Sequence, residues 1–276
     1  MIHIALAFHD NDGNYALHAA ATLVSLFRRR ASPITAHILH DAGLNDTGRA
    51  RLAAVAEHFG QGLRLHAVPE LPPASAADLP PQFGPGSLYR LHLPALVDEE
   101  QVIYLDCDIC CTLDIRELWE QAAQGCAPSG EAPLLSCVRN MTDGRAVEKK
   151  GLNPAWYFNS GVLVFRPRRL RAVFPDLMAA VLRLLPELPR PLLFPDQDAL
   201  NVIFRRLPLH WLDERFNYQL HVAGRWLQPP DLLEGKVLHF CGHKPWCEPL
   251  FPSALGHLEN YRFLRRLLTA PRSPAT

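Results

Sequence analysis

The amino-acid sequence predicts an α/β fold, in which a largely parallel central sheet is flanked by helices on both faces. Three observations lead to this prediction. Strand-like and helix-like segments alternate along residues 1–68, which is typical of βαβ units. Of the 276 residues, 48% are hydrophobic, which is enough for a large core. No internal repeat and no clean linker interrupts the chain, so we expect one main domain over residues 1–256.

The first third of the chain carries the clearest elements. Apolar residues in β-like order predict strands at residues 2–8, 34–40 and 63–68. Apolar residues at helical spacing predict helices at 15–30 and 46–59, the second behind a cap at Asp46 or Thr47. This βαβαβ order favours parallel strands joined by helical crossovers.

The rest of the chain has a less regular order. A proline-rich stretch at 69–86 predicts a loop, and a helix follows at 87–97. Further strands are expected at residues 102–105, 133–138, 157–165 and 236–240, and helices at 169–185 and 196–204. Residues 257–276 are expected to form a basic amphipathic segment followed by a flexible tail. Its aromatic residues and arginines suit either a terminal helix packed on the domain or peripheral contact with an anionic membrane.

Composition excludes several classes of protein. Lys and Arg number 28, as do Asp and Glu, so the formal net charge is zero and nucleic-acid binding has no electrostatic support. No stretch reaches the roughly 18 apolar residues of a membrane span. The segment MIHIALAFHD has no export signal and seven cysteines make an odd number, so we expect reduced thiols and a cytoplasmic location, with the inner membrane face as a peripheral alternative.

An acid pair directly follows the expected strand at 102–105. Asp106 and Asp108 are two residues apart, so in an extended chain both carboxylates point to one side and can reach one cation. Two hard oxygen ligands suit Mn²⁺ or Mg²⁺. The alternative is a strand end with solvated or capping acids. Because neither G-x-G-x-x-G nor G-x-x-x-x-G-K-[ST] occurs, a bound nucleotide would need a metal at its phosphates.

Four other segments carry polar residues where plain loops would not need them. HDNDGNY closes the first strand, YFNSGVLVF opens a later one, DQDALN starts a helix, and HFCGHKPW follows a buried strand. Each alone has an ordinary structural explanation, such as a helix cap at Asp196 or a core histidine at His239. Their occurrence together indicates a ligand site.

In order and spacing these segments and YLDCD resemble the retaining glycosyltransferases of family 8, which include bacterial lipopolysaccharide galactosyl- and glucosyltransferases. The resemblance spans nearly the whole chain. It implies a single domain of the nucleotide-diphosphosugar transferase type, called GT-A, that uses UDP-glucose or UDP-galactose with Mn²⁺, or Mg²⁺ in its place.

The resemblance also implies roles for individual residues. The metal ligands would be Asp106, Asp108 and His239. The residues expected to bind the donor nucleotide sugar are Phe8, Asp10, Asp12, Asn14, Tyr15, Arg90, Asp106, Cys107, Asn159, Gly242 and Lys244. Either Asp10 or Asp12 would take the nucleotide-binding role, because the turn is longer than the usual DDNY. Gln197, flanked by Asp196 and Asp198, is expected at the reacting carbon.

The function expected from the resemblance is transfer of galactose or glucose, with retention, to a saccharide of lipopolysaccharide or another surface glycan. Because an amide is a poor nucleophile, a front-face reaction assisted by Gln197 is favoured over a double displacement. Two alternatives stay open at this point. One is an inactive nucleotide-sugar-binding protein. The other is a phosphatase similar to the haloacid dehalogenases, in whose D-x-D-x-T signature Cys110 would occupy the threonine position.

Overall fold

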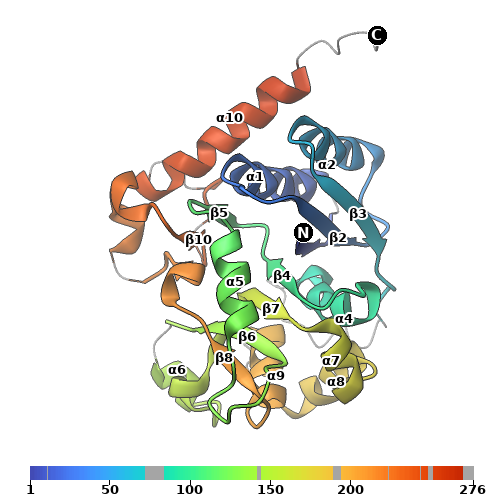
Figure 1. Ribbon diagram of the computed structural model, residues 1–276, viewed down its shortest axis with the longest axis vertical. Helices are drawn as coiled ribbons and strands as arrows, with labels where there is room; N and C mark the ends of the chain where they lie inside the picture. The colour runs from blue at the N-terminus through green and yellow to red at the C-terminus, as the bar shows by residue number, and fades with distance from the viewer. Residues whose placement is uncertain are drawn as a thin grey trace.

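A computed structural model describes residues 1–10, 12–71, 84–141, 144–188, 194–222, 224–242, 244–247 and 251–269 of the chain. Its seven-stranded sheet has the order β3-β2-β1-β4-β7-β6-β8 (Figure 1). The strands are β1 (Ile2–Phe8), β2 (Ile34–His40), β3 (Gly62–Ala67), β4 (Val102–Leu105), β6 (Leu135–Arg139), β7 (Phe158–Phe165) and β8 (Leu209–Trp211). The expected strands at 2–8, 34–40 and 102–105 are confirmed to the residue.

The sheet is largely parallel, as predicted, with one reversal. Strands β3, β2, β1 and β4 pair in parallel, whereas β7 pairs antiparallel with both β4 and β6. The first residues of β7 therefore lie at the same sheet edge as the last residues of β1 and β4. The backbone confirms this placement, because the Asp106 amide donates to the Gly161 carbonyl over 2.9 Å.

Helices cover both faces of the sheet (Figure 1). One face packs against α1 (Asn14–Arg28), α2 (Asp46–His58), α5 (Arg116–Gln124) and α10 (Leu255–Thr269). The other packs against the 3₁₀ segment η1 (Pro85–His92) and against α4 (Leu93–Leu96), α7 (Pro167–Val173), α8 (Leu177–Leu184) and α9 (Pro195–Phe204). A further short helix is α6 (Gly144–Glu148).

Three expected helices differ from the structure. The helix expected at 169–185 is two helices, because Pro175 cannot continue the first and Asp176 caps α8 by accepting from the Ala179 amide over 2.8 Å. Residues 87–97 are a 3₁₀ segment followed by only one α-helical turn. Helix α2 is capped by Asn45 rather than by Asp46 or Thr47. Most of the expected proline-rich loop, residues 72–83, lies outside the described residues.

A second, three-stranded sheet stands beside the main one. It consists of β5 (Ile109–Cys111), β10 (Val237–His239) and β9 (Tyr218–Gln219), in the order β5-β10-β9. In the antiparallel β5–β10 pair His239 lies opposite Ile109, so the end of β10 comes next to Asp108. Within the part of the chain that the structure describes, no helix has the length and apolar character of a membrane span.

Candidate metal and sugar-nucleotide site

The acid pair lies in the short connection between the two sheets. Asp106 directly follows β4, and Asp108 directly precedes β5. The Asp108 side chain is 8% exposed and that of Asp106 is 24% exposed, so one carboxylate is buried and the other faces an opening. As expected from their spacing, both carboxylates reach the same point.

His239 completes a group of three ligand-type side chains. Its Nε2 lies 3.5 Å from Asp108 Oδ1 and 3.8 Å from Asp106 Oδ2, and one donor atom of each residue lies within 4.8 Å of the other two. Two carboxylates and one imidazole suit Mn²⁺ and similar first-row divalent ions. The three residues that the resemblance implied as metal ligands thus meet in the structure.

A buried amide fixes the orientation of the histidine ring. His239 Nδ1 lies 2.9 Å from Asn217 Oδ1, and an amide oxygen can only accept, so Nδ1 carries the proton. The lone pair of Nε2 consequently points to the carboxylates. Asn217 is itself held, because its Nδ2 donates to Asn159 Oδ1 over 2.8 Å. Metal-binding histidines characteristically have such a partner on the second ring nitrogen.

Asp108 shows most clearly that a cation would fit this site. Its buried Oδ1 has no hydrogen-bond partner among the described residues, while Oδ2 accepts from the Lys244 ammonium. Burial alone would raise the pKa of Asp108, but Lys244 and His239 hold that pKa below its usual range. Burial lowers the pKa of His239, which keeps its imidazole neutral near pH 7. The site therefore offers two carboxylates and a neutral imidazole, a set of ligands that fits a divalent ion.

Arg90 joins the metal-type site to the expected sugar site. Its Nη2 lies 3.0 Å from Asp106 Oδ1 and its Nε 3.4 Å from Asp196 Oδ2, while Nη1 donates to the Ser160 carbonyl over 2.6 Å. The Tyr104 hydroxyl donates to the same Asp106 oxygen over 2.7 Å. Burial works against the charge of Arg90, but Asp106 and its neighbours raise its pKa, so the guanidinium stays charged.

Gln197 sits in a closed network at the start of α9. Its Oε1 accepts from the Ser160 amide over 3.0 Å, and its Nε2 donates to the Tyr157 hydroxyl over 3.0 Å. Tyr157 in turn donates to Asp198 Oδ1 over 2.6 Å, and Lys150 Nζ lies 2.6 Å from Asp198 Oδ2. The glutamine side chain is therefore held in one orientation.

Asp196 also has partners for its carboxylate. Its Oδ2 accepts from Ser160 Oγ over 2.9 Å in addition to the Arg90 contact. Burial raises the pKa of Asp196, and Arg90 only partly offsets the shift. Because Ser160 immediately precedes Gly161, whose backbone meets Asp106, this network lies directly beside the three metal-type ligands.

Asp10 and Asp12, the two aspartates of the N-terminal turn that the sequence left as alternatives, have different surroundings. Asp10 is buried and caps α1, since its two carboxylate oxygens accept from the Tyr15 and Ala16 amides, each over 3.2 Å. Asp12 is exposed and accepts from Asn14. Phe8 is buried in the core at the end of β1, whereas Tyr15 is 46% exposed. Of the two carboxylates, only that of Asp12 faces solvent.

The other residues expected at the donor site differ in their surroundings. The Cys107 thiol is buried and lies 3.9 Å from the Ala7 carbonyl, away from the acids on either side of it. Gly242 has φ +82°, a left-handed conformation that favours glycine, and this turn leads to Lys244. Trp246 stacks on His18 with ring centroids 3.7 Å apart. Next to the Gln197 network, Trp156, Tyr157, Asn201, Arg205 and Arg206 line part of a cavity of about 300 Å³.

Several residues of the site were missed by the sequence reasoning. Asn217, Tyr104, Tyr157 and Lys150 each hold a predicted site residue in place. For Tyr104 and Tyr157 a signal existed, since they are the first residues of the quoted motifs YLDCD and YFNSGVLVF. Asn217 and Lys150 carry no such signal, because their partners are 22 and 48 residues away along the chain.

Comparison with solved structures identifies the fold. The galactosyltransferase LgtC, solved with donor and acceptor sugar analogues, superposes with a TM-score of 0.74 at 23% identity, covering 98% of both chains. The glycosyltransferase GlyE of Streptococcus pneumoniae TIGR4 superposes with a TM-score of 0.66 at 18% identity, covering 97% of this chain and 63% of its own. The fold is that of the GT-A glycosyltransferases.

The family follows from the sequence comparisons. The model of "Glycosyl transferase family 8" matches residues 3–249, so this chain belongs to that family, and it is a glycosyltransferase. The resemblance inferred from the motifs is thereby confirmed. General stress protein A of Bacillus subtilis is 27% identical over 255 residues, 85% of each protein. Galactinol synthase 5 of Arabidopsis thaliana is 29% identical over 174 residues, and the match covers 49% of that protein's length.

Proposed function

We propose that this glycosyltransferase moves glucose or galactose from a UDP-sugar to a saccharide acceptor, with a divalent ion, Mn²⁺ in preference to Mg²⁺. The observation that carries the proposal is the meeting of Asp106, Asp108 and His239 at the end of β4, beside the buried Gln197 network. In this arrangement the three side chains would hold a cation, and the cation would bind the diphosphate of a sugar nucleotide.

The proposed cation and Lys244 would both stabilise the negative charge of the leaving group. When bound by Asp106, Asp108 and His239, the ion would stabilise the negative charge of the departing diphosphate. Lys244, whose ammonium already contacts Asp108, adds a second positive charge at the same place. Charge stabilisation that grows as the sugar leaves lowers the barrier rather than only tightening donor binding.

Retention of configuration is best explained by a front-face reaction. The carboxylates beside Gln197 are both engaged, Asp196 with Ser160 and Arg90 and Asp198 with Lys150 and Tyr157. A nucleophile for a double displacement would have to break one of these buried networks. We therefore infer that the leaving phosphate oxygen deprotonates the acceptor hydroxyl while the Gln197 carbonyl oxygen stabilises the sugar cation. A covalent sugar adduct on any of these three residues, trapped and found by mass spectrometry, would contradict this mechanism.

The acceptor is proposed to be a saccharide of lipopolysaccharide or another surface glycan. The cavity lined by Trp156, Arg205 and Arg206 adjoins the Gln197 network and supports an acceptor with both an apolar sugar face and anionic groups. One structural neighbour is described as a galactosyltransferase, which makes galactose the first donor sugar to test.

The decisive experiment is a UDP-release assay. Purified protein is incubated with UDP-galactose or UDP-glucose, with Mn²⁺ or with a chelator, alongside Asp108→Asn and the control Asp231→Asn, an exposed acid outside the site. Release that depends on the ion, is selective for one sugar and is lost only in Asp108→Asn would support the proposal. UDP and Mn²⁺ binding without release, with a panel of acceptors, would favour the inactive binding protein instead. Phosphate release from a simple phosphomonoester would favour the phosphatase alternative.

We propose a cytoplasmic location with optional peripheral contact to an anionic membrane through residues 257–276. The support is the set of exposed arginines on α10, Arg262, Arg265 and Arg266. Vesicle co-sedimentation tests this contact. Binding to anionic vesicles that is weakened by salt and by changing these arginines to glutamine would support it, and absence of binding at low salt would exclude it.

A further inference from the structure

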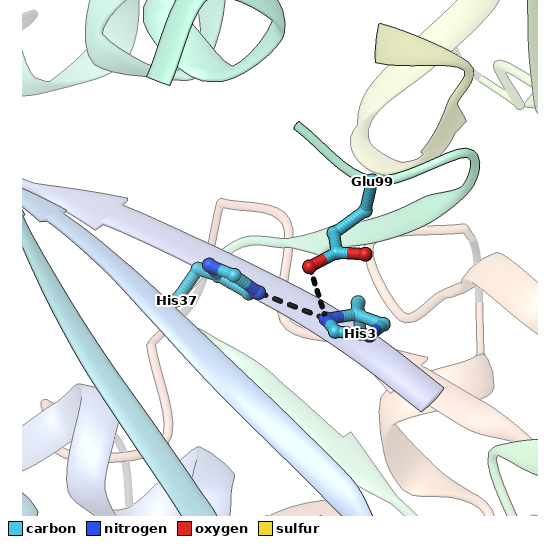
Figure 2. A group of neighbouring side chains, drawn as sticks. All are labelled: His3, His37 and Glu99. Atoms are coloured by element: carbon cyan, nitrogen blue, oxygen red, sulfur yellow. Dashed lines mark hydrogen bonds and ion pairs between the residues drawn. The ribbon is translucent and has the colours of Figure 1, made fainter. Parts of the chain in front are cut away.

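A second group of metal-type side chains lies away from the sugar-nucleotide site. Figure 2 shows His3 on β1, His37 on β2 and Glu99 in the loop between α4 and β4, with their polar ends pointing toward one another. His3 Nδ1 lies 3.1 Å from His37 Nε2 and 3.6 Å from Glu99 Oε1. All three donor atoms lie within 4.8 Å of one another.

The cluster occupies the other end of the sheet from the acid pair. His3 is the second residue of β1, whereas Asp10 and the expected nucleotide-binding turn follow its last residue. At about 3.3 Å per residue, the five steps from His3 to Phe8 span roughly 17 Å. The two groups of ligands are therefore separate sites.

The ring of His37 is oriented as a metal ligand requires. Its Nδ1 lies 2.9 Å from Nε2 of His66 on β3, which can accept the Nδ1 proton. With that proton placed, His37 Nε2 presents its lone pair to His3 and Glu99. His66 thus serves as the outer partner that fixes the tautomer of a ligating histidine. The same arrangement held Nε2 of His239 toward the acid pair.

The surroundings keep both imidazoles neutral and leave the cluster accessible. Burial lowers the pKa of His37 to about 3, and burial also lowers the pKa of His3. The His37 residue is 1% exposed, while the side chains of His3 and Glu99 are 12% and 29% exposed, so an ion can enter from the Glu99 side. Arg64 Nη1 lies 3.4 Å from Glu99 Oε1, and its 58% exposed side chain can turn into solvent.

We propose that His3, His37 and Glu99 bind a Zn²⁺ ion that joins β1, β2 and the loop before β4. Tetrahedral Zn²⁺ with ligands at about 2.0–2.1 Å places donor atoms roughly 3.3 Å apart, which the 3.1 and 3.6 Å distances bracket. Two imidazoles and one carboxylate are a donor set that Zn²⁺ accepts, with the fourth position taken by water. Binding tightens the sheet rather than taking part in sugar transfer, so this inference does not depend on the proposed function.

Without the ion, the same side chains can form a chain of hydrogen bonds. His3 Nδ1 would then donate to His37 Nε2, and His37 would donate to His66. This alternative leaves the histidines satisfied and predicts no effect of zinc on the cluster. The experiment must therefore measure Zn²⁺ binding directly, in a protein whose acid-pair site is disabled.

The test uses the full chain with Asp108→Asn as background, because Zn²⁺ can also bind at the acid pair. To this background are added Glu99→Gln, His3→Gln or, as a control, His58→Gln, an exposed histidine outside the cluster. Zn²⁺ binding is followed by calorimetry and by the thermal shift, and Co²⁺ is added as a visible-absorption probe of the ligand geometry. Circular dichroism shows that each variant is folded.

We expect one Zn²⁺ to bind per chain in the Asp108→Asn background and in the His58→Gln control, and zinc to raise the Tm of both proteins. We also expect an affinity at least about tenfold weaker in both Glu99→Gln and His3→Gln. A folded background protein that binds no Zn²⁺, or equal affinity in the background and in both cluster variants, would overturn the proposal.

Discussion

At Gly161 the main chain of β7 passes directly against the metal-type ligands. A Cβ atom at this position would lie 2.1 Å from His239 Cε1 and 2.8 Å from Asp106 Oδ2, far closer than any allowed contact. We therefore expect Gly161→Ala to displace the imidazole and to lower Mn²⁺-dependent transfer by at least about a hundredfold, since misplacement of about 1 Å at a site has such effects. Steady-state rates over a range of Mn²⁺ concentrations measure this.

Gly256→Ala is the matched control for that change. A Cβ at Gly256 meets no atom within 4 Å, and the residue lies in the first turn of α10. The substitution should leave activity unchanged and the fold at least as stable, because alanine favours a helix. Full activity in Gly161→Ala would show that the ligands are not held as the structure has them.

Asn217 acts on the metal-type ligands through His239. Asn217→Leu removes the acceptor that keeps the proton on Nδ1, and we expect an approximately 10- to 100-fold weaker affinity for Mn²⁺. Asn217→Asp keeps an acceptor and should retain more of that affinity. Titration of Mn²⁺ by calorimetry separates the two variants. If both bind Mn²⁺ like the native protein, Asn217 does not position the ring.

At the residue scale the sequence could predict which side chains meet beside β4, but not which residues hold them in place. Asp106, Asp108 and His239 stand in recognisable motifs, and their meeting in space is confirmed. Asn217 stands in a segment without a recognisable motif. It reaches His239 because β9, which follows it, pairs with β10, and no local sequence pattern encodes that pairing. Residues that orient a site are chosen by tertiary packing, so a single sequence shows them poorly.

At the scale of elements, the direction of β7 decides where the site forms. The sequence predicted a strand here and placed Asn159 to Gly161 at its start, but in a wholly parallel sheet a strand's start lies at the edge opposite to the carboxyl ends. Because β7 is antiparallel to β4, its first residues face Asp106. Strand direction depends on the connections, and the helical segments on either side of residues 157–165 do not specify it.

The elements that the sequence did not predict include the nine-residue helix α5 and three very short strands. Strands β5, β8 and β9 have 3, 3 and 2 residues, which is too few to show an alternating pattern. The long βαβαβ unit was predicted nearly to the residue, because each of its elements carries a full apolar repeat. The break between α7 and α8 could have been read from the Pro175–Asp176 pair, a helix stop followed by a cap.

Helix α10 is the element whose role the sequence left open. Leu264 is fully buried against the core of the α1 and α2 side, and the Tyr261 hydroxyl lies 2.7 Å from His18 Nδ1. We expect Leu264→Ala to lower the free energy of unfolding by about 2–5 kcal/mol, as a cavity in a packed core does. Urea unfolding measures this. A change as small as that of Leu268→Ala, at a position 39% exposed, would mean that α10 is not part of the folded core.

At the scale of the whole molecule, two groups of metal-type side chains that contain histidine lie at opposite ends of the main sheet. His239 at one edge faces the carboxylates proposed to hold a cation for the reaction, whereas the His3 cluster lies at the other end of β1, between neighbouring strands. His257, in the first turn of α10, is a different case: it is fully buried, and neither ring nitrogen has a hydrogen-bond partner among the described residues. Burial lowers the pKa of His257 to about 3.

The stability of the molecule should consequently depend on pH through His257. The unfolded chain binds a proton near pH 6.5 and the folded chain only near pH 3, so protonation favours unfolding as the pH falls below 6.5. For this one group the loss amounts to about 2 kcal/mol between pH 7.5 and 5. His257→Leu removes the titrating group, so its free energy of unfolding should fall less over that range, by up to this amount. Urea unfolding at both pH values measures the difference, with the exposed-histidine variant His58→Gln as a control expected to follow the native protein. Equal pH dependence in native protein and His257→Leu would show that this ring takes up its proton without unfolding.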